Sequence, residues 1–439
     1  MSLSATVKHL AEHTPTDRNR VVDLLRAAAI AVVVVGHWLM AAVHVDASGD
    51  LRRGDLLSLA DWTHPLTWVL QVMPVFFLVG GYANALSWRG AQLRGASYGA
   101  WLRARLRRLI IPVLPLMVFW AVVAPAAHGL GVSPAALRIA SMASLVPTWF
   151  LAAYVVVVAL TPVTLALWDR LGWGSVVAGV LAGGLIDAVS ITTDQLLVGF
   201  LNYVVVWGTV HQLGYAWLDG ALSGTRRRLV LAAVGLAGLL VLVVAGPYAV
   251  SMVGLDGTGI NNAYPTRVTL AFLGLMQAGV VMALEPLLRI LAERPRVWRA
   301  VIVVNARIMT VYLWHLTALG VVVALSLTLD GAGLRLTPNT ASWWVTRPLW
   351  ILVLGLATAG LVALLGRFEQ PAADHRPAPH PARPLLAMVG VCAGLGLMAD
   401  IGVVTADGTL RWYLPLLPVV VCLVFGVTAL NGRHLTARP

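Results

Sequence analysis

The sequence is poor in charge: Asp, Glu, Lys and Arg make up 11% of its 439 residues, whereas hydrophobic residues make up 59%. A soluble globular domain is roughly 25% charged, so this composition excludes an ordinary soluble fold. Apolar runs longer than a soluble core helix recur along the whole chain. We therefore expect a multi-pass protein of the cell membrane, surrounded mostly by lipid.

Cysteine and lysine are also scarce. Cys392 and Cys422 both lie in apolar runs, and no Cys or His cluster has ligand spacing, so we expect no disulfide, metal or resident cofactor. Lys8 is the only lysine among 31 basic residues, so the net charge of +12 comes from arginines in short segments between apolar runs. That distribution is typical of loops facing anionic lipid headgroups and argues against nucleic-acid binding.

Twelve apolar runs reach, or nearly reach, the ~20 residues of a membrane-spanning helix. They lie near residues 22–43, 66–88, 106–127, 149–168, 174–190, 198–217, 229–249, 267–288, 300–327, 347–365, 385–403 and 412–430. We therefore predict an all-α bundle of about 10–12 transmembrane helices. If the N-terminus is cytoplasmic, the inside segments collect 22 basic residues and the outside segments seven. This bias predicts that both termini are cytoplasmic.

Prolines cluster after the tenth apolar run, where they favour a stiff linker over a continuing helix. We predict a cytoplasmic N-terminal segment (1–20), a transmembrane domain (21–366), a Pro-rich cytoplasmic linker (367–384), and two additional transmembrane helices with a short tail (385–439). With no soluble catalytic domain at either end, any chemistry is expected in or between the helices.

The first apolar run carries the most informative polar residues, Asp23, Arg26 and His37. Arg26 and His37 are 11 residues apart, which at ~100° per residue places both on one helix face, about 16 Å apart along the axis. A guanidinium near the cytoplasmic surface and an imidazole in the outer half suit a long, anionic thioester donor. The alternatives are that Arg26 snorkels to the headgroups with Asp23 as its partner, and that His37 is a buried, hydrogen-bonded histidine.

Five motifs resemble the membrane-bound acyltransferase-3 family, and together they cover residues 20 to about 365. They are Arg26-x10-His37, the Phe-rich stretch Pro74–Tyr82, the Arg-rich run Arg105–Pro112, Trp149-Phe150-Leu151, and the late Tyr312-Leu313-Trp314-His315. Three departures leave the acceptor open. Gly80 replaces a serine, Ala27 replaces a glycine, and the glutamate that often follows Trp-Phe-Leu is absent.

The resemblance implies a protein of about ten helices that moves acyl groups onto extracytoplasmic sugars and related acceptors. It implies that His37 is the catalytic base or a transient acyl carrier, and that Arg26 faces an acyl-CoA donor from the cytoplasm. Arg105 and Arg108 are expected to dock the donor's phosphates, although a positive-inside loop needs arginines anyway. The acceptor is a glycan, lipid or metabolite of unspecified identity.

Several other polar residues are candidates for supporting roles. Arg307 is expected in the inner third of the ninth helix as a second phosphate contact or a snorkelling residue, and His315 is either a packed histidine or a site member. We expect His211 and Gln212 either to line the cytoplasmic half of a cavity or, as the favoured alternative, to form hydrogen bonds between helices. Asn261, Asn262 and Arg267 are expected to form a cluster that holds an acceptor or caps a helix. The alternatives to the enzyme are a transporter or lipid flippase and an inactive scaffold, although no symmetrical interrupted helices are evident.

Overall fold

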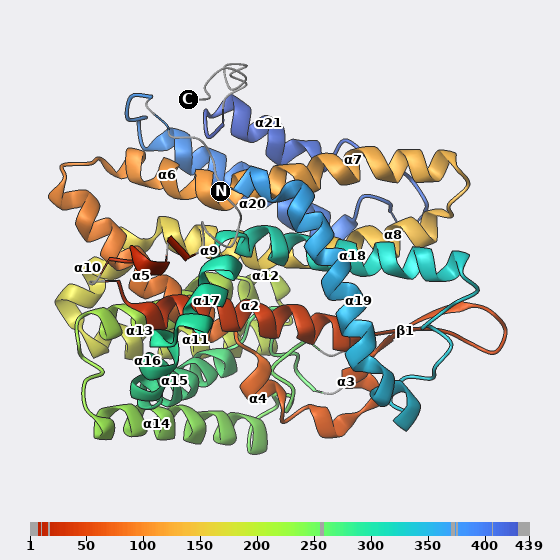
Figure 1. Cartoon of the computed structure of the whole chain (residues 1–439). Helices are drawn as coiled ribbons and strands as arrows, with labels where there is room; N and C mark the ends of the chain where they lie inside the picture. Colours follow the sequence, from red (N-terminus) through yellow and green to blue (C-terminus); the bar gives the residue numbers. More distant parts are fainter. Residues whose placement is uncertain are drawn as a thin grey trace. The chain divides into compact units, whose positions relative to one another are not determined.

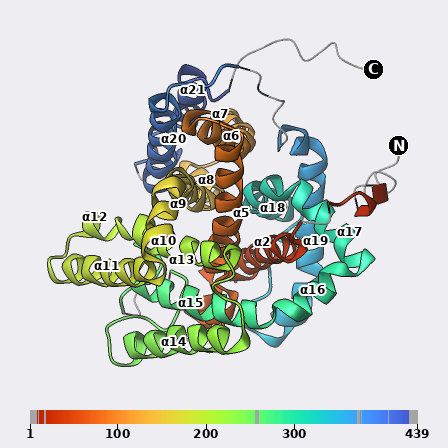
Figure 2. The ribbon, with the colours of Figure 1, turned by 90° about the vertical axis from the view of Figure 1, so that its left-hand side faces the viewer.

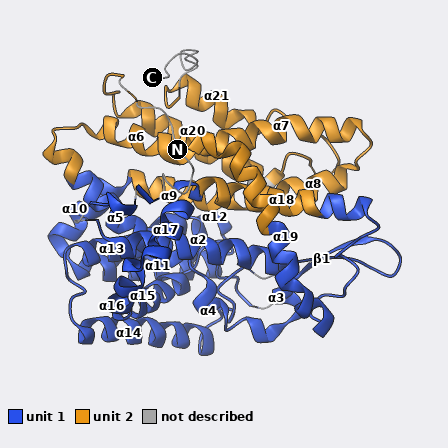
Figure 3. Ribbon diagram, viewed as in Figure 1, with its two compact units in different colours: residues 1–89, 160–308, 323–354 blue, residues 90–159, 309–322, 355–439 orange. Residues whose placement is uncertain are grey.

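The computed structural model describes residues 8–9, 11–15, 18–254, 259–369, 374, 376–405 and 407–428, without side chains at 399 and 400. Helices dominate this part of the chain, and the strands form one two-stranded sheet. The contacts divide the chain into two units (Figure 3). Unit 1 holds residues 1–89, 160–308 and 323–354, and unit 2 holds residues 90–159, 309–322 and 355–439.

Unit 1 contains the first helix and most of the middle of the chain (Figure 1). Its elements are α2 (Arg20–Met40), β1 (Ala41–Val45), β2 (Leu51–Asp55), α3 (Leu56–Leu59), η1 (Asp61–Thr63), α4 (Thr67–Leu70), most of α5 (Met73–Leu93), α10 (Thr161–Leu171), α11 (Trp173–Thr192), α12 (Leu196–Gly199), α13 (Asn202–Leu218), α14 (Thr225–Val244), α15 (Val268–Ala283), α16 (Glu285–Glu293), α17 (Pro295–Ala306), and parts of α18 (Ile308–Thr328) and α19 (Ala341–Leu365).

Unit 2 contains the basic helix α6 and the C-terminal helices. Its elements are the end of α5, α6 (Tyr98–Ile110), η2 (Ile111–Val113), α7 (Leu114–Gly129), α8 (Pro134–Leu145), α9 (Pro147–Ala159), the other parts of α18 and α19, η3 (Gly366–Glu369), α20 (Ala382–Ile401) and α21 (Leu416–Val424). Within this unit α20 packs against α6, α9 and α21. The boundaries at residues 21, 367 and 385 stay predictions.

Nine helical segments of the described chain are long and apolar enough to cross a membrane. They are Arg20–Met40, Thr67–Leu93, Tyr98–Gly129, Pro134–Ala159, Trp173–Thr192, Leu196–Leu218, Thr225–Val244, Ile308–Thr328 and Ala341–Glu369. The pair α15 and α16, bent by 58°, gives a tenth if it is one span. The predicted all-α polytopic membrane fold is confirmed.

The predicted ninth span, 300–327, is wrong as a single helix. It breaks at Arg307, where α17 ends and α18 begins. The Glu369 carboxylate accepts hydrogen bonds from the backbone N–H groups of Met309 and Thr310 at 2.9 and 3.1 Å. A side chain sixty residues away therefore satisfies the first donors of α18, which the hydrophobic pattern could not reveal.

Two other predicted spans also need correction. The run 149–168 is divided, because α8 and α9 form the apolar segment and α10 is a separate helix; prolines in the first turns of all three helices mark these starts. The predicted span 412–430 contains only the nine-residue α21, about 13 Å long and too short to cross ~30 Å of hydrocarbon. Its last two residues lie outside the described chain.

The first helix is shorter at its end than the predicted 22–43 because the chain turns into a β-hairpin. Strands β1 and β2 pair antiparallel, with Ala41 opposite Asp55. The Asp46 carboxylate closes the turn by accepting hydrogen bonds from the backbone N–H groups of Ser48 and Asp50 at 2.9 and 3.0 Å. Strand β1 begins at Ala41, directly after the last residue of α2, Met40, so the hairpin sets the end of the helix.

Close backbone contacts hold the helices of unit 1 together. Helix α14 lies alongside α15 in both views (Figure 1 and Figure 2). Between α5 and α13, a Cβ at Gly81 would overlap the carbonyl of His211, and one at Gly214 would overlap the backbone of Leu78 and Tyr82. Only glycine permits this approach, and Gly81 belongs to the Phe-rich motif Pro74–Tyr82 of the second predicted span. Helix α2 packs against α16 and α17.

Candidate functional site

Helix α2 carries Arg26 and His37 without a break between them. It begins at an N-cap where the Asn19 side chain accepts a hydrogen bond from the N–H of Val21 at 3.1 Å. An unbroken α-helix repeats every 3.6 residues, so the predicted common stripe holds. Ile30 and Val33 lie on that stripe and are 2% and 9% exposed.

The opposite face of α2 is open, since Ala28 and Ala31 are exposed. The stripe of Arg26 and His37 therefore faces protein and the other side faces the surroundings. Both side chains are half-buried. The exposed face of α2 is therefore opposite the stripe, and the roles of the two side chains stay predictions.

Arg26 is part of a charged cluster at the start of α2. Asp23, 5% exposed, lies between two guanidinium groups: its Oδ1 is 3.2 Å from Arg26 Nη1, and its Oδ2 is 2.7 Å from Arg18 Nε. Asn305 of α17 donates to the Asp23 carbonyl at 2.9 Å and holds this end of the helix. The partnership of Arg26 with Asp23 is thus present, and Asp23 is shared by the guanidinium groups of Arg18 and Arg26.

His37 lies in the last turn of α2, just before β1. Its carbonyl accepts a hydrogen bond from the N–H of Ala41, which closes the helix. Along the axis His37 is about 16 Å from Arg26, by the rise of 1.5 Å per residue. The two ends of the stripe therefore carry different chemistry: fixed positive charge at one and an imidazole at the other.

Arg307 lies at the junction of α17 and α18 rather than inside a helix. Its Nη1 donates to the carbonyl of Ala306 at 3.1 Å, and its side chain is half-buried. Two residues earlier in the chain, Asn305 binds the Asp23 backbone. Arg307 therefore belongs to the same unit as the charged cluster of α2, and its role stays a prediction.

The late motif of unit 2 is a packed core. His315 is fully buried, and its Nδ1 lies 2.6 Å from the Tyr312 carbonyl, which assigns the proton to Nδ1. The Tyr312 hydroxyl donates to the carbonyl of Pro147 at 2.9 Å, and its ring meets Phe150 edge-on at 5.6 Å. The structure thus brings two of the five sequence motifs together, since Phe150 belongs to the Trp-Phe-Leu triplet.

Trp314 belongs to the same core. It is 2% exposed and meets the ring of Phe119 edge-on, with centroids 5.2 Å apart. Such an arrangement fixes an indole by packing. Tyr312 and Trp314 therefore hold α18 against its neighbours within unit 2.

Helix α6 of unit 2 separates its arginines into two groups. Asp374 of the Pro-rich segment binds Arg103 at 3.1 Å and Arg107 at 3.7 Å. Hydrogen bonds from Arg376 hold the pKa of Asp374 down at about 2. The predicted donor-binding residues of this helix, Arg105 and Arg108, have different surroundings. Arg105 lies 5.9 Å from the Trp101 ring, and Arg108 is exposed.

Comparison with known protein families identifies the family of this chain. A family model described as an acyltransferase domain, acyltransferase family 3, matches residues 19–367 of the 439. The chain belongs to this family. It is therefore a multi-pass membrane protein of an acyltransferase family. No curated protein and no solved structure matches the chain.

The matched range of this acyltransferase-3 protein runs from the N-cap of α2 into η3. It includes Asp23, Arg26, His37, the basic helix α6 and the late motif, and it leaves out Arg18, α20 and α21. The catalytic and donor-binding roles of the individual side chains stay predictions.

Sequence reasoning anticipated one polar network of this acyltransferase and missed part of it. His211 is fully buried; its Nε2 lies 3.1 Å from Asn84 Nδ2 and its Nδ1 lies 2.9 Å from the Tyr215 hydroxyl. Ser175 donates to Gln212 at 2.9 Å. The predicted hydrogen bonding between helices is confirmed, while Asn84 had no signal beyond being an amide in an apolar run.

A second polar cluster surrounds Asp187 in α11. Its carboxylate accepts from Asn202 at 2.8 Å, Arg267 at 3.2 Å, Tyr248 at 3.1 Å and the N–H of Val268 at 2.8 Å. Four donors satisfy the charge that burial would otherwise penalise. The sequence analysis named Arg267 but gave no partner for it, and the structure supplies Asp187.

Proposed function

We propose that this acyltransferase moves an acyl group from cytoplasmic acyl-CoA to a hydroxyl of an extracytoplasmic glycan, lipid or metabolite. The α2 stripe is the observation that carries the proposal: a continuous helix presents a guanidinium group at one end and an imidazole about 16 Å away at the other, with buried residues between them. Membership of the acyltransferase-3 family supports the reaction type.

The orientation follows from the arginine distribution, which favours cytoplasmic termini. Arg26 then lies near the cytoplasmic face and His37 in the outer half of the membrane. A donor bound by its phosphates at the inner end would extend its thioester along the stripe toward His37. The acceptor would approach from the outer end.

The chemistry requires one base. Neutral His37 takes the proton of the acceptor hydroxyl as its oxygen attacks the thioester carbonyl. The carbon–sulfur bond then breaks, the CoA thiolate leaves, and the proton passes to its sulfur. The products are the acylated acceptor and free CoA. In a second version His37 itself accepts the acyl group and passes it to the acceptor.

In this proposal arginine side chains bind the phosphate groups of the donor. Arg26 is the proposed phosphate contact on α2, because guanidinium groups bind phosphate in a bidentate manner. Arg105, Arg108 and Arg307 are the further phosphate contacts. Tyr312, Trp314 and His315 pack within unit 2, where the Nδ1 proton of His315 is donated to the Tyr312 carbonyl.

The proposal is tested by following the thioester. Purified full-length protein is supplied with acetyl-CoA labelled in the acetyl group, and free CoA thiol is measured together with label on the protein. We expect protein-dependent release of CoA, with water as a slow acceptor. Acetyl-, propionyl- and longer acyl-CoA that all stay intact, with no label on the protein, would contradict the donor assignment.

A further inference from the structure

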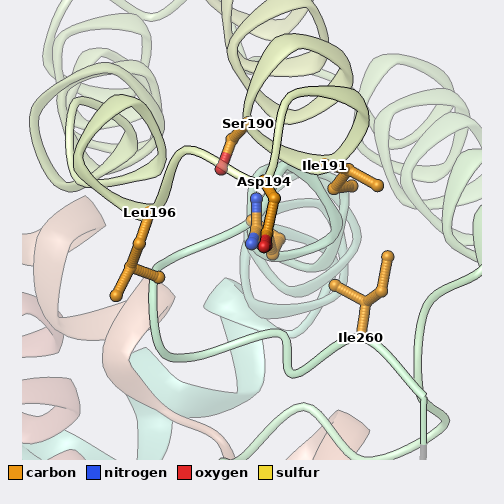
Figure 4. Close-up of a pocket in the computed structure, with 6 residues that line it drawn as sticks. Ser190, Ile191, Asp194, Leu196 and Ile260 are labelled. Carbon is orange, nitrogen blue, oxygen red and sulfur yellow. The ribbon is translucent and has the colours of Figure 1, made fainter.

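Helix α16 is a short and strongly bent continuation of α15. The two helices meet at Leu284 with a bend of 58°, and Pro286 lies in the first turn of α16. The pocket in Figure 4, which Ile260 and Arg267 line, lies at the other end of α15, about 24 Å away by the 16 residues of that helix. With nine residues, about 13 Å long, α16 cannot cross a bilayer by itself.

One face of α16 is apolar and turned away from the protein. Its exposed residues follow the three- and four-residue spacing of a helix face. They are Leu284, Leu287, Ile290 and Leu291, which are 44%, 64%, 58% and 36% exposed. Ala292 is fully buried, and α16 packs against α2 and α17. The exposed leucine stripe therefore faces the surroundings of the protein.

The same surface carries many arginines. The Arg289 side chain is 63% exposed, and exposed arginines lie at the starts of α14 and α17, namely Arg226, Arg227, Arg294, Arg296 and Arg299. The start of α14 is held against α16, because Arg228 Nη2 lies 2.9 Å from Glu285 Oε2. We define residues 225–230 and 284–299 as the α16 surface. It contains seven arginines and two glutamates, so it is strongly positive.

Helix α14 indicates the depth of this surface in the membrane. Leu229 and Val230, directly after its three arginines, are 54% and 53% exposed, and the helix is apolar and long enough to cross a bilayer. Arginines followed at once by exposed apolar residues mark the level where headgroups give way to acyl chains. Because the Arg228–Glu285 pair joins α16 to this level, the leucine stripe lies at the same boundary.

The chemistry of the α16 surface selects its ligand. Guanidinium groups bind phosphate in a bidentate manner, and an apolar helix face at the membrane boundary contacts acyl chains. A soluble anion such as a nucleotide accounts for the arginines but leaves the leucine stripe in water. A neutral phospholipid accounts for the stripe but not for the excess of arginines. An anionic phospholipid satisfies both features.

We infer that α16 lies along the membrane surface and, with the starts of α14 and α17, binds the headgroup of an anionic phospholipid, while its leucine stripe contacts the acyl chains. This inference goes beyond the proposed acyl transfer and does not depend on it. Helices α16 and α17 pack against α2, and Asn305 of α17 donates to the Asp23 carbonyl at 2.9 Å. A lipid bound here therefore stabilises the part of unit 1 that holds the start of α2.

Binding is tested by native mass spectrometry of the full-length protein in detergent. Dioleoyl phosphatidylglycerol and dioleoyl phosphatidylcholine are the probes, because they differ in headgroup charge but share their acyl chains. The variant R294Q/R296Q/R299Q removes three exposed charges from the α16 surface. The charge-matched control is R52Q/R53Q/R335Q, whose three exposed arginines lie in β2 and in the segment before α19.

We expect the wild type to bind phosphatidylglycerol at least tenfold more tightly than phosphatidylcholine. R294Q/R296Q/R299Q should weaken phosphatidylglycerol binding at least tenfold, and the control should stay within twofold of the wild type. Equal affinity for the two lipids, or equal losses in the two triple variants, would overturn the assignment. Displacement of phosphatidylglycerol by an equal concentration of palmitoyl-CoA would also overturn it, because the surface would then be a site for acyl-CoA.

The position of α16 is tested separately with spin labels in nanodiscs that contain phosphatidylglycerol. Leu287→Cys places the label on the leucine stripe, and Glu293→Cys places it on an exposed position about 120° around the same helix. Both variants also carry C392A/C422A, which removes the free cysteines. We expect the label at 287 to collide mainly with oxygen dissolved in the acyl chains and the label at 293 mainly with a water-soluble nickel chelate. Equal access of the chelate to both labels would contradict a helix along the membrane surface.

Discussion

Nη1 of Arg26 lies 3.2 Å from Oδ1 of Asp23, one turn earlier on the same helix, while Arg18 binds the other oxygen of that carboxylate at 2.7 Å. One carboxylate thus serves two guanidinium groups. Only Arg26 shares the stripe with His37, so the two arginines make a matched pair for testing donor binding.

We predict that Arg26→Gln raises the KM for acyl-CoA at least tenfold, whereas Arg18→Gln raises it less than threefold. A charge-assisted hydrogen bond contributes about 1.5–3 kcal/mol, or roughly a 10- to 100-fold change in affinity. Arg18 is half exposed and can be replaced by solvent. Steady-state kinetics of CoA release measures both. Equal KM values in the two variants would remove Arg26 from the donor site.

The Asp187–Arg267 pair should be essential for folding of unit 1. Asp187→Ala leaves Arg267 buried without its carboxylate, which costs about 3–5 kcal/mol. Removing both charges in D187L/R267L should cost clearly less than the sum of the single variants. Thermal unfolding in detergent measures the effect, with Asp61→Ala, whose side chain is 92% exposed, as the control. Additive losses would show that the two residues are not coupled.

Gly214 should tolerate no side chain, whereas Gly208 on the same helix should. A Cβ at Gly214 overlaps the backbone of α5, and a Cβ at Gly208 meets nothing within 4 Å. Overpacking of this kind costs about 1–3 kcal/mol or more. Gly214→Ala should lower the unfolding temperature by several degrees and Gly208→Ala should leave it unchanged or raise it. Similar unfolding temperatures would contradict the close approach of α5 and α13.

Acid should release the segment that Asp374 ties to α6. The pKa of this carboxylate is lowered to about 2, below its unfolded value near 4. Its contribution to stability, about 2 kcal/mol at most, is therefore complete above pH 4 and lost as the pH falls toward 2. Limited proteolysis of the 376–380 segment should be faster in Asp374→Asn than in the wild type at pH 6. The two proteins should converge near pH 2, and a constant difference across that range would refute the pair.

Much of the fold could be predicted because membrane helices follow from apolar runs of sufficient length. The start of α2, the position of α14 and the pairing of Glu285 with Arg289 at 3.0 Å match simple periodicity and spacing. The break at Arg307 could not be predicted, because its cause is the distant carboxylate of Glu369. The start of the hairpin was hidden, because the first three residues of β1 continue the predicted apolar run 22–43 and a short apolar run does not distinguish helix from strand.

Part of the candidate site could likewise be predicted from the sequence, and part required the structure. The stripe of Arg26 and His37 follows from helix geometry alone, and the structure shows which face of α2 is buried. The pairing of Asp187 with Arg267 joins residues 80 positions apart and needs the tertiary fold. The same holds for Arg103 and Arg107, because only the structure shows that Asp374 occupies them and not Arg105 or Arg108.

The central claim is that His37 moves the proton in acyl transfer, and replacing it tests that claim most directly. His44, half-buried in β1, is the matched control. We predict that His37→Ala lowers kcat for CoA release by about 10²- to 10⁴-fold with little change in donor affinity, and that His44→Ala keeps kcat within threefold. A His37→Ala protein that releases CoA at the wild-type rate would contradict the mechanism.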